Sequence, residues 1–352
     1  MNYSVSTFLK NNRNTKNDTL NISRKSLDKI PEELKDFVWI KKLYIRKNAI
    51  TSISTSDFPK HINLIDISFN RIIKINSSML TMELVVLKVQ SNEIEEFYGK
   101  EYINLKKIDL SHNKIKDSDK IILNIGLKKL NISDNRLDKL PKIPGTLKSL
   151  NFSHNNISEI NKTNLLPKSL KKLYGENNGM ILFDTIIPID IHTINFEGNR
   201  LSEFIDISNT NIVDLNLGNN CLKYLPNSEK IPLSLKKLDI SNNFIANVPN
   251  QLRNRDNLII IFNDDQWDPW NPITYNSYDN NDNDDNSWAD IFETEKSGSI
   301  NNKLLDGSIQ FFKQEDPIQN NFNPNWWKNI TKQHIKTQHM TYNIPVTNTI
   351  SL

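Results

Sequence analysis

The sequence predicts a right-handed solenoid of the α/β type, in which short parallel strands stack into one sheet and irregular segments return along the outside. The main observation is an eleven-position template, L-x-x-L-x-L-x-x-N-x-L, that recurs in unbroken register. Its steps are only 20 to 23 residues, too short for a full return helix and two turns. Residues 17–262 therefore hold about eleven full repeats and a partial one, which start at 17, 40, 62, 84, 105, 127, 147, 170, 191, 212, 235 and 258.

Each template contains a short strand. Positions 4 and 6, such as Leu130 and Ile132, share one face and are expected in the core, whereas positions 3, 5 and 7 point to the opposite, concave face. One strand per repeat builds a parallel sheet. Repeat eight breaks the pattern because Gly175 stands at position 6, where a core residue is expected.

The ninth template position carries asparagine in ten successive repeats. Compositional bias cannot place one residue type at a fixed phase so often. An inward-turned amide there can pair with backbone groups of the bend that would otherwise be buried without partners. We expect a structural ladder of Asn48, Asn70, Asn92, Asn113, Asn135, Asn155, Asn178, Asn199, Asn220 and Asn243.

The template resembles the leucine-rich repeat family over residues 17–262. Phrases such as LPKSLKKL (166–173) and IPLSLKKLDISNN (231–243) are similar to the short, bacterial-type repeats of secreted effector proteins. The resemblance implies a strongly curved horseshoe with a concave parallel β-sheet. Prolines in the return segments favour polyproline or 3₁₀ structure on the convex side. The Asn-, Ile- and Lys-rich composition also resembles leucine-rich repeat proteins of giant DNA viruses and AT-rich protists.

The two ends of a solenoid need caps. Residues 1–16 are expected to form the N-terminal cap, with Phe8 and Leu9 as its apolar contacts. Residues 263–352 are expected to be an acidic, tryptophan-containing C-terminal cap and a partly disordered tail, with Trp267 and Trp270 over the last repeat. The alternative for the tail aromatics is a linear motif that docks a second partner.

The charge of the chain is unevenly distributed. Residues 263–352 contain 13 acidic and 6 basic side chains, whereas residues 1–262 contain 28 acidic and 38 basic ones. Lysines at positions 2 and 3 are expected to line one margin of the horseshoe, as a solvated rim or as a site for phosphate or an acidic partner. These are Lys41, Lys42, Lys106, Lys107, Lys128, Lys129, Lys171, Lys172, Lys236 and Lys237. Aromatic residues are not interleaved with them, which argues against nucleic-acid binding.

Specificity is expected at variable positions of the concave face. Most of these positions hold small polar residues, but repeats two to four and repeat eight differ. An aromatic residue, cations and aliphatic residues on adjacent strands have the composition of a protein-binding surface. The candidate binding residues are Tyr44, Arg46, Leu64, Phe69, Val86, Lys88, Gln90, Tyr174 and Glu176.

The sequence indicates no catalytic machinery, metal site or cofactor. The four histidines of the repeats stand at scattered phases, and no phosphate loop or nucleophile elbow is present. Asp282, Asp284, Asn286, Asp290 and Glu293 match parts of a calcium-loop pattern, but Ser287 replaces its glycine, so we expect no calcium site.

A soluble intracellular protein, cytoplasmic or in the host cytoplasm if viral, is expected, because Cys221 is the single cysteine and neither a signal peptide nor a membrane span is apparent. The function expected is a non-enzymatic module that binds a protein partner on its concave face, without membrane contact. The alternatives are a substrate-recognition adaptor for ubiquitination and an effector that regulates kinases or phosphatases. Both extend the fold-level analogy.

Overall fold

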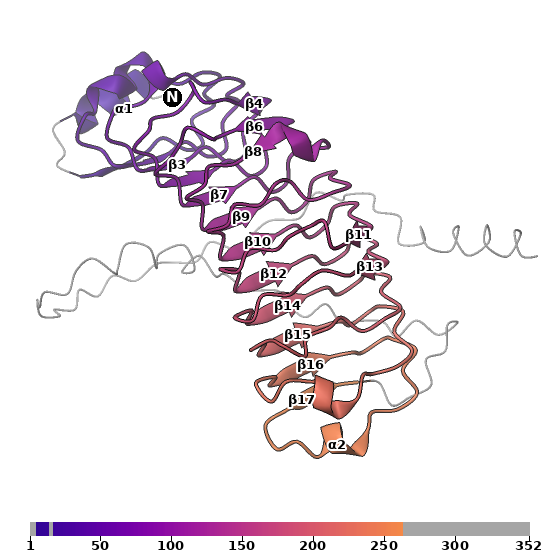
Figure 1. The fold of residues 1–352 in the computed structure, drawn as a ribbon. Helices are drawn as coiled ribbons and strands as arrows, with labels where there is room; N and C mark the ends of the chain where they lie inside the picture. Colours follow the sequence, from indigo (N-terminus) through magenta and orange to yellow (C-terminus); the bar gives the residue numbers. More distant parts are fainter. Residues whose placement is uncertain (1–4, 14–16, 263–352) are drawn as a thin grey trace, which may run out of the picture. The chain divides into compact units, whose positions relative to one another are not determined.

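The computed structural model describes residues 5–13 and 17–262 of the 352-residue chain. Its central element is one 12-stranded sheet in which every neighbouring pair is parallel (Figure 1). The strands follow chain order: β1 (Thr19–Asn21), β2 (Lys42–Tyr44), β3 (Leu64–Asp66), β5 (Val86–Lys88), β7 (Lys107–Asp109), β9 (Lys129–Asn131), β10 (Ser149–Asn151), β12 (Lys172–Tyr174), β14 (Thr193–Asn195), β15 (Asp214–Asn216), β16 (Lys237–Asp239) and β17 (Ile259–Ile261). The predicted parallel-sheet solenoid is confirmed.

The register of the sheet keeps equal template positions side by side. Leu130 pairs with Leu150, and Leu150 pairs with Leu173, so the position-4 side chains form a continuous row in the core. These three leucines are at most 2% exposed. The residues before and after them point to the other face of the sheet, which is the concave one.

The last repeat begins one residue earlier than the sequence predicts. Ile259 pairs with Lys237 and Ile260 with Leu238, so the repeat starts at Asn257 and not at Leu258. Ile260 takes the core side, while Ile259 is exposed. Three consecutive isoleucines show no alternation of polar and apolar residues, and therefore do not specify which of them faces inward.

The return segments contain four 3₁₀ helices: η1 (Glu32–Asp36), η2 (Thr55–Asp57), η3 (Ser118–Lys120) and η4 (Ser228–Lys230). They also contain a three-stranded sheet of β4 (Lys74–Ile75), β6 (Glu96–Tyr98) and β8 (Ile121–Ile122), and a two-stranded sheet of β11 (Glu159–Ile160) and β13 (Leu182–Phe183). The short helix α2 (Asn250–Arg253) precedes β17. Two-residue strands such as β4 are too short to show a periodicity, so the sequence does not predict them.

Helix α1 (Val5–Asn12) lies at the N-terminal end of the array (Figure 1). Leu9 is fully buried and belongs to the core, and the ring centroid of Phe8 is 5.2 Å from Nζ of Lys25. Arg13 forms an ion pair with Asp36 of η1. The predicted C-terminal cap, with Trp267 and Trp270, and the tail beyond it lie outside the described residues.

Each position-9 asparagine joins neighbouring repeats through its amide. Asn135 Nδ2 lies 3.0 Å from the carbonyl oxygen of Leu110 in the preceding repeat and 3.2 Å from that of Ile132 in its own. Its Oδ1 accepts a hydrogen bond of 3.0 Å from the backbone N–H of Ile115. The same pattern recurs from Asn48 to Asn243. These bonds pair backbone groups at the bend that the sheet leaves without a partner.

Position 8 has a positive φ, between 52° and 69°, in all eleven full repeats. Asn, Asp and His enter this left-handed region more readily than other side chains, and Gly enters it without cost. That preference accounts for His112 and His154, which share position 8 and adopt φ values of 52° and 54°. The residues at position 8 are Arg24, Lys47, Phe69, Ser91, His112, Asp134, His154, Asn177, Gly198, Asn219 and Asn242.

A second set of side-chain bonds closes the end of each strand. An Asn or Asp at position 5 accepts a hydrogen bond from the backbone N–H at position 7, over 2.9–3.2 Å. These residues are Asn21, Asp66, Asp109, Asn131, Asn151, Asn195, Asn216 and Asp239. The small polar residues at position 5 of the concave face are therefore strand caps, a role that the repeat pattern alone does not indicate.

A phenylalanine from the preceding repeat occupies the space beside Gly175. A Cβ added at Gly175 would lie 2.3 Å from Cζ of Phe152, which is fully buried. The ring of Phe152 packs 6.3 Å, between centroids, from that of Phe196, and Phe196 packs 4.8 Å from Phe183. Gly175 is thus required by the packing of the core, and it does not mark a gap.

Replacing Asn135 by alanine should destabilise the array by about 3–5 kcal/mol, because several buried backbone groups lose their partner at once and each costs about 1–3 kcal/mol. Urea unfolding monitored by circular dichroism measures the loss. The exposed neighbouring residue Asn156 is the control, and Asn156→Ala should change stability by less than about 0.5 kcal/mol. Equal effects of the two substitutions would contradict a structural role for the ladder.

Asp109→Asn should raise stability at neutral pH and flatten its pH dependence. Burial raises the pKa of the Asp109 carboxyl above its ordinary value of 3.8, although hydrogen bonds from Ser111 oppose the shift. A raised folded-state pKa means that the wild type loses stability as pH rises from about 4 through the folded-state pKa. Asparagine keeps the strand cap, as Asn131 does in the next repeat. Thermal unfolding between pH 4 and 7 tests this, with the half-buried Asp239→Asn as control. A wild type that gains stability over that range relative to Asp109→Asn would contradict it.

Candidate functional site

The regular strand caps are interrupted at three strands of the concave face. Position 5 is Tyr44 in β2, Lys88 in β5 and Tyr174 in β12. In β2 and β12 a serine of the preceding repeat replaces the cap: the N–H of Arg46 donates to Ser23 Oγ over 3.0 Å, and that of Glu176 donates to Ser153 Oγ over 3.2 Å. At β2 and β12 the serine hydroxyl thus takes over the cap, which leaves position 5 free to hold a tyrosine.

The third interruption has neither kind of cap. Lys88 cannot accept the hydrogen bond from the N–H of Gln90, and among the described residues the hydroxyl of Ser68 in the preceding repeat bonds to Asp66 Oδ1 over 2.6 Å and not to that N–H. Among the described residues, the buried Oε1 of Gln90 also has no hydrogen-bond partner. Gln90 therefore presents groups on the concave face that its own fold does not use.

Phe69 is the unusual residue of this region. It is the one aromatic at position 8 among the full repeats, its φ is 56°, and its side chain is 41% exposed. Two cations lie beside its ring, with Arg46 Cζ 5.9 Å and Lys47 Nζ 5.3 Å from the centroid. The Arg46 Nε lies 3.6 Å from Asp66 Oδ2, and among the described residues this buried nitrogen has no hydrogen-bond partner.

The two aliphatic candidates stand next to each other in register. Leu64 of β3 pairs with Val86 of β5, at position 3 on the concave side. Both side chains are buried, with Leu64 9% and Val86 1% exposed, although the sequence analysis placed them at exposed positions. Lys42 and Lys107 flank the pair in the same row, because each occupies position 3 of the adjoining strand. Of the candidate binding residues in repeats two to four, the accessible ones are therefore the polar and aromatic ones.

Repeat eight holds a hydrogen-bonded carboxylate. Glu176 accepts a hydrogen bond from the Ser153 hydroxyl and one of 2.6 Å from Asn195 Nδ2. Burial raises the pKa of Glu176, and the nearby charge of Glu197 adds to the shift. Glu197 in turn accepts hydrogen bonds of 3.0 Å from Asn216 and Asn219. Tyr174 and Glu176 thus lie in a polar network over β12, β14 and β15.

The predicted basic margin divides into two rows. The position-3 lysines begin strands, so they point to the concave face: Lys42, Lys107, Lys129, Lys172 and Lys237. The position-2 lysines precede the strands: Lys41, Lys106, Lys128, Lys171 and Lys236. The expectation of one common margin is wrong in this respect, since successive side chains of a strand alternate between its faces.

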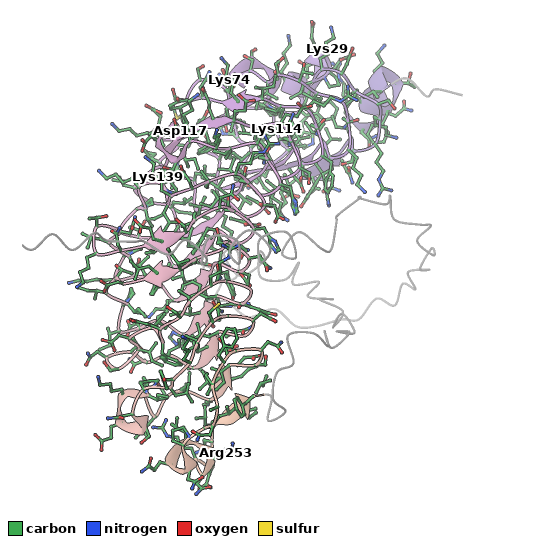
Figure 2. The ribbon with its side chains drawn as sticks, turned by 90° about the vertical axis from the view of Figure 1, so that its right-hand side faces the viewer. Lys29, Lys74, Lys114, Asp117, Lys139 and Arg253 are labelled. Carbon is green, nitrogen blue, oxygen red and sulfur yellow. The ribbon has the colours of Figure 1, made fainter. Side chains whose placement is uncertain are left out.

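A separate charged hollow of about 520 Å³ is lined by residues of the return segments, which follow the position-9 asparagines in sequence. Figure 2 shows three of its lining residues, Lys114, Asp117 and Lys139, on the N-terminal half of the array, far from Arg253. Lys114 pairs with Glu93 over 2.7 Å, and Lys139 pairs with Asp119 over 3.0 Å. Three of its five cations, Lys114, Lys120 and Lys139, are held in ion pairs with carboxylates, which weakens the attraction of this hollow for an anion.

The described residues outside the concave face form no chemical centre. Among the residues that the structure describes, no three His, Cys, Asp or Glu side chains gather as metal ligands. Cys221 is half-buried, and burial raises the pKa of its thiol, which lowers its reactivity. The calcium-loop match at 282–293 lies outside the described residues. Within the described ranges, no helix combines the length and apolar character needed to cross a membrane.

Comparison with known proteins places these features in a family. The Leucine Rich Repeat model matches residues 104–126 and 146–173. Osteomodulin of Bos taurus is 28% identical over 248 residues, 59% of this chain and 53% of its own length. Lumican of Coturnix japonica is 27% identical over 241 residues, 64% of each chain. The chain thus spans about half to two thirds of the length of these relatives.

Solved structures show the same fold. YopM from Yersinia enterocolitica aligns with a TM-score of 0.53 and 21% identity, covering 72% of this chain and 57% of that one. YopM from Yersinia pestis aligns with a TM-score of 0.52 and 21% identity, covering 73% of this chain and 80% of that one.

The expectation of an intracellular location is contradicted by the relatives. Osteomodulin, lumican and the transforming growth factor beta activator LRRC33 of Danio rerio are extracellular matrix, secreted or membrane proteins. The argument from a single cysteine fails for a physical reason. A stacked core and an asparagine ladder hold the repeats together without disulfides, so the cysteine count says little about the compartment.

The repeating template, the stacked parallel strands, the asparagine bonds and the comparisons agree. The chain is a leucine-rich repeat protein.

Proposed function

We propose that this protein is a non-enzymatic interaction module that binds another protein on its concave face. Leucine-rich repeat proteins generally mediate protein–protein interaction. The primary contact surface in this proposal comprises Tyr44, Arg46, Phe69, Lys88 and Gln90, on repeats two to four. Leu64 and Val86 are buried in the same strands and are not part of this surface.

The observation that carries the proposal is the conformation of Phe69. A bulky side chain in the left-handed region costs roughly 1–3 kcal/mol, and such strain concentrates at functional sites. The other full repeats place Asn, Asp, His, Gly, Ser, Lys or Arg at this position, so the fold itself has no need of an aromatic ring there. An exposed aromatic ring with cations beside it is well suited to contact a partner.

The neighbouring polar atoms support the same surface. The Arg46 Nε is a donor and the Gln90 Oε1 an acceptor, and both are buried without a hydrogen bond among the described residues. Buried polar groups without partners are costly unless a ligand or water pairs with them. Rotation of the Arg46 and Gln90 side chains is needed to uncover these two atoms, after which the backbone of a bound protein supplies both kinds of partner.

Tyr174 and Glu176 form the second contact surface of this proposal. They interrupt the strand caps as Tyr44 does, and they lie six strands further along the sheet. A partner that spans the concave face reaches both surfaces. The adaptor role in ubiquitination and the regulation of kinases or phosphatases describe what such a partner does, and both stay predictions.

Phe69→Asn should stabilise the fold by about 0.5–1 kcal/mol, because it relieves the left-handed strain while losing a weak cation–π contact. It should also weaken partner binding at least tenfold. A protein captured on the immobilised full-length chain and identified by mass spectrometry is titrated against wild type and variant, and unfolding is measured in parallel.

The matched control is Asp134→Asn, at the same template position with φ of 52° in a repeat outside both contact surfaces. It should leave binding unchanged. Full binding by Phe69→Asn, or equal loss in the control, would contradict the assignment of the surface.

A further inference from the structure

The charges of the concave face are segregated along the array. At template positions 3, 5 and 7 of β2, β3, β5, β7 and β9, the charged residues are Lys42, Arg46, Lys88, Lys107 and Lys129 against Asp66 and Asp109. The same positions of β12, β14, β15 and β16 hold Glu176, Glu197, Asp214 and Asp239 against Lys172 and Lys237. The first half is therefore net basic and the second half net acidic.

The strand between the halves is uncharged. β10 presents Ser149, Asn151 and Ser153 to the concave side. It lies between β9 and β12 in the sheet. The summed charges of the two halves on either side of β10 thus have opposite signs.

The two acidic residues of the basic half are largely committed to the fold. Asp66 and Asp109 are 1% and 8% exposed, and each accepts two hydrogen bonds from the serine two residues later. Lys107 is fully buried as well, so the accessible cations of this half are Lys42, Arg46, Lys88 and Lys129, and they determine the sign of its surface field.

We propose that the concave face recognises an extended protein segment whose charge is itself segregated, with acidic residues over β2–β9 and basic residues over β12–β16. This inference rests on the proposed function and adds the chemistry of the partner. Complementary fields select the partner and set its orientation, even where single charge pairs contribute little affinity.

The dimensions define the length of such a segment. From β2 to β16 the sheet makes nine strand-to-strand steps, or roughly 43 Å at about 4.8 Å per step. An extended chain rises about 3.3 Å per residue, so roughly 13 residues span the face. The acidic part then covers about six residues and the basic part about five.

Two fluorescent peptides of identical composition test the proposal with the full-length chain. One has about five glutamates, a short Gly-Ser spacer and about five lysines in separate blocks, and the other alternates the two charges. The segregated peptide should bind at least tenfold more tightly in fluorescence anisotropy at low salt, and its advantage should shrink as salt is added. Equal affinities, including no measurable binding of either peptide, would overturn the proposal.

A photo-crosslinker at one end of the segregated peptide tests the orientation. From the acidic end it should react with residues 40–135, and from the basic end with residues 170–245. Crosslinks from both ends to the same half would overturn the proposed arrangement.

Lys88→Gln should lower the affinity for the segregated peptide about threefold. Lys148→Gln makes the same change in charge at an exposed position that precedes β10, so it should have no effect. Equal losses in the two variants would indicate attraction to the general basic surface and overturn the site.

The outcomes separate this inference from the proposed function. If the captured protein depends on Phe69 but the two peptides bind alike, the concave face is a binding surface that does not select segregated charge. If the captured protein is also insensitive to Phe69→Asn, the proposed function fails as well.

Discussion

The structure depends on one constraint: every repeat must offer the next one the same backbone groups at the same bend. A parallel strand of three residues supplies few hydrogen bonds, so side chains must complete the pairing where the chain turns away from the sheet. The position-9 amide does this by bonding its own repeat and the preceding one together. Because each asparagine bonds to two repeats, the loss of one asparagine destabilises both its own repeat and the preceding one.

Two further template positions serve the same bend. Position 8 must enter the left-handed region, and position 5 must cap the end of the strand. Once these duties are assigned, most polar residues of the concave face belong to the scaffold. Phe69 at position 8 and Lys88 at position 5 are poorly suited to these roles, so folding alone does not explain why they are there. The same reasoning removes Gly175 from the candidates, because the ring of Phe152 requires it.

Periodicity is sufficient to predict the solenoid, because a fixed phase of leucine and asparagine over ten successive repeats has a single structural interpretation. Periodicity is insufficient where polar and apolar residues do not alternate. Three adjacent isoleucines leave the register of the last strand open, and two-residue strands on the convex side have no pattern. The concave position of Tyr44, Arg46 and Lys88 follows from strand alternation alone. The burial of Val86 and the unused atoms of Gln90 depend on packing between repeats, which a sequence does not display.

Scaffold and specificity can be separated by restoring the template at its three interrupted caps. The triple variant Tyr44→Asn, Lys88→Asn and Tyr174→Asn returns position 5 to the residue that caps β9, β10, β14 and β15. Its unfolding free energy and its affinity for the captured partner are measured together. Our account predicts unchanged or higher stability and loss of partner binding. A variant that folds equally well and binds its partner with unchanged affinity would contradict the account.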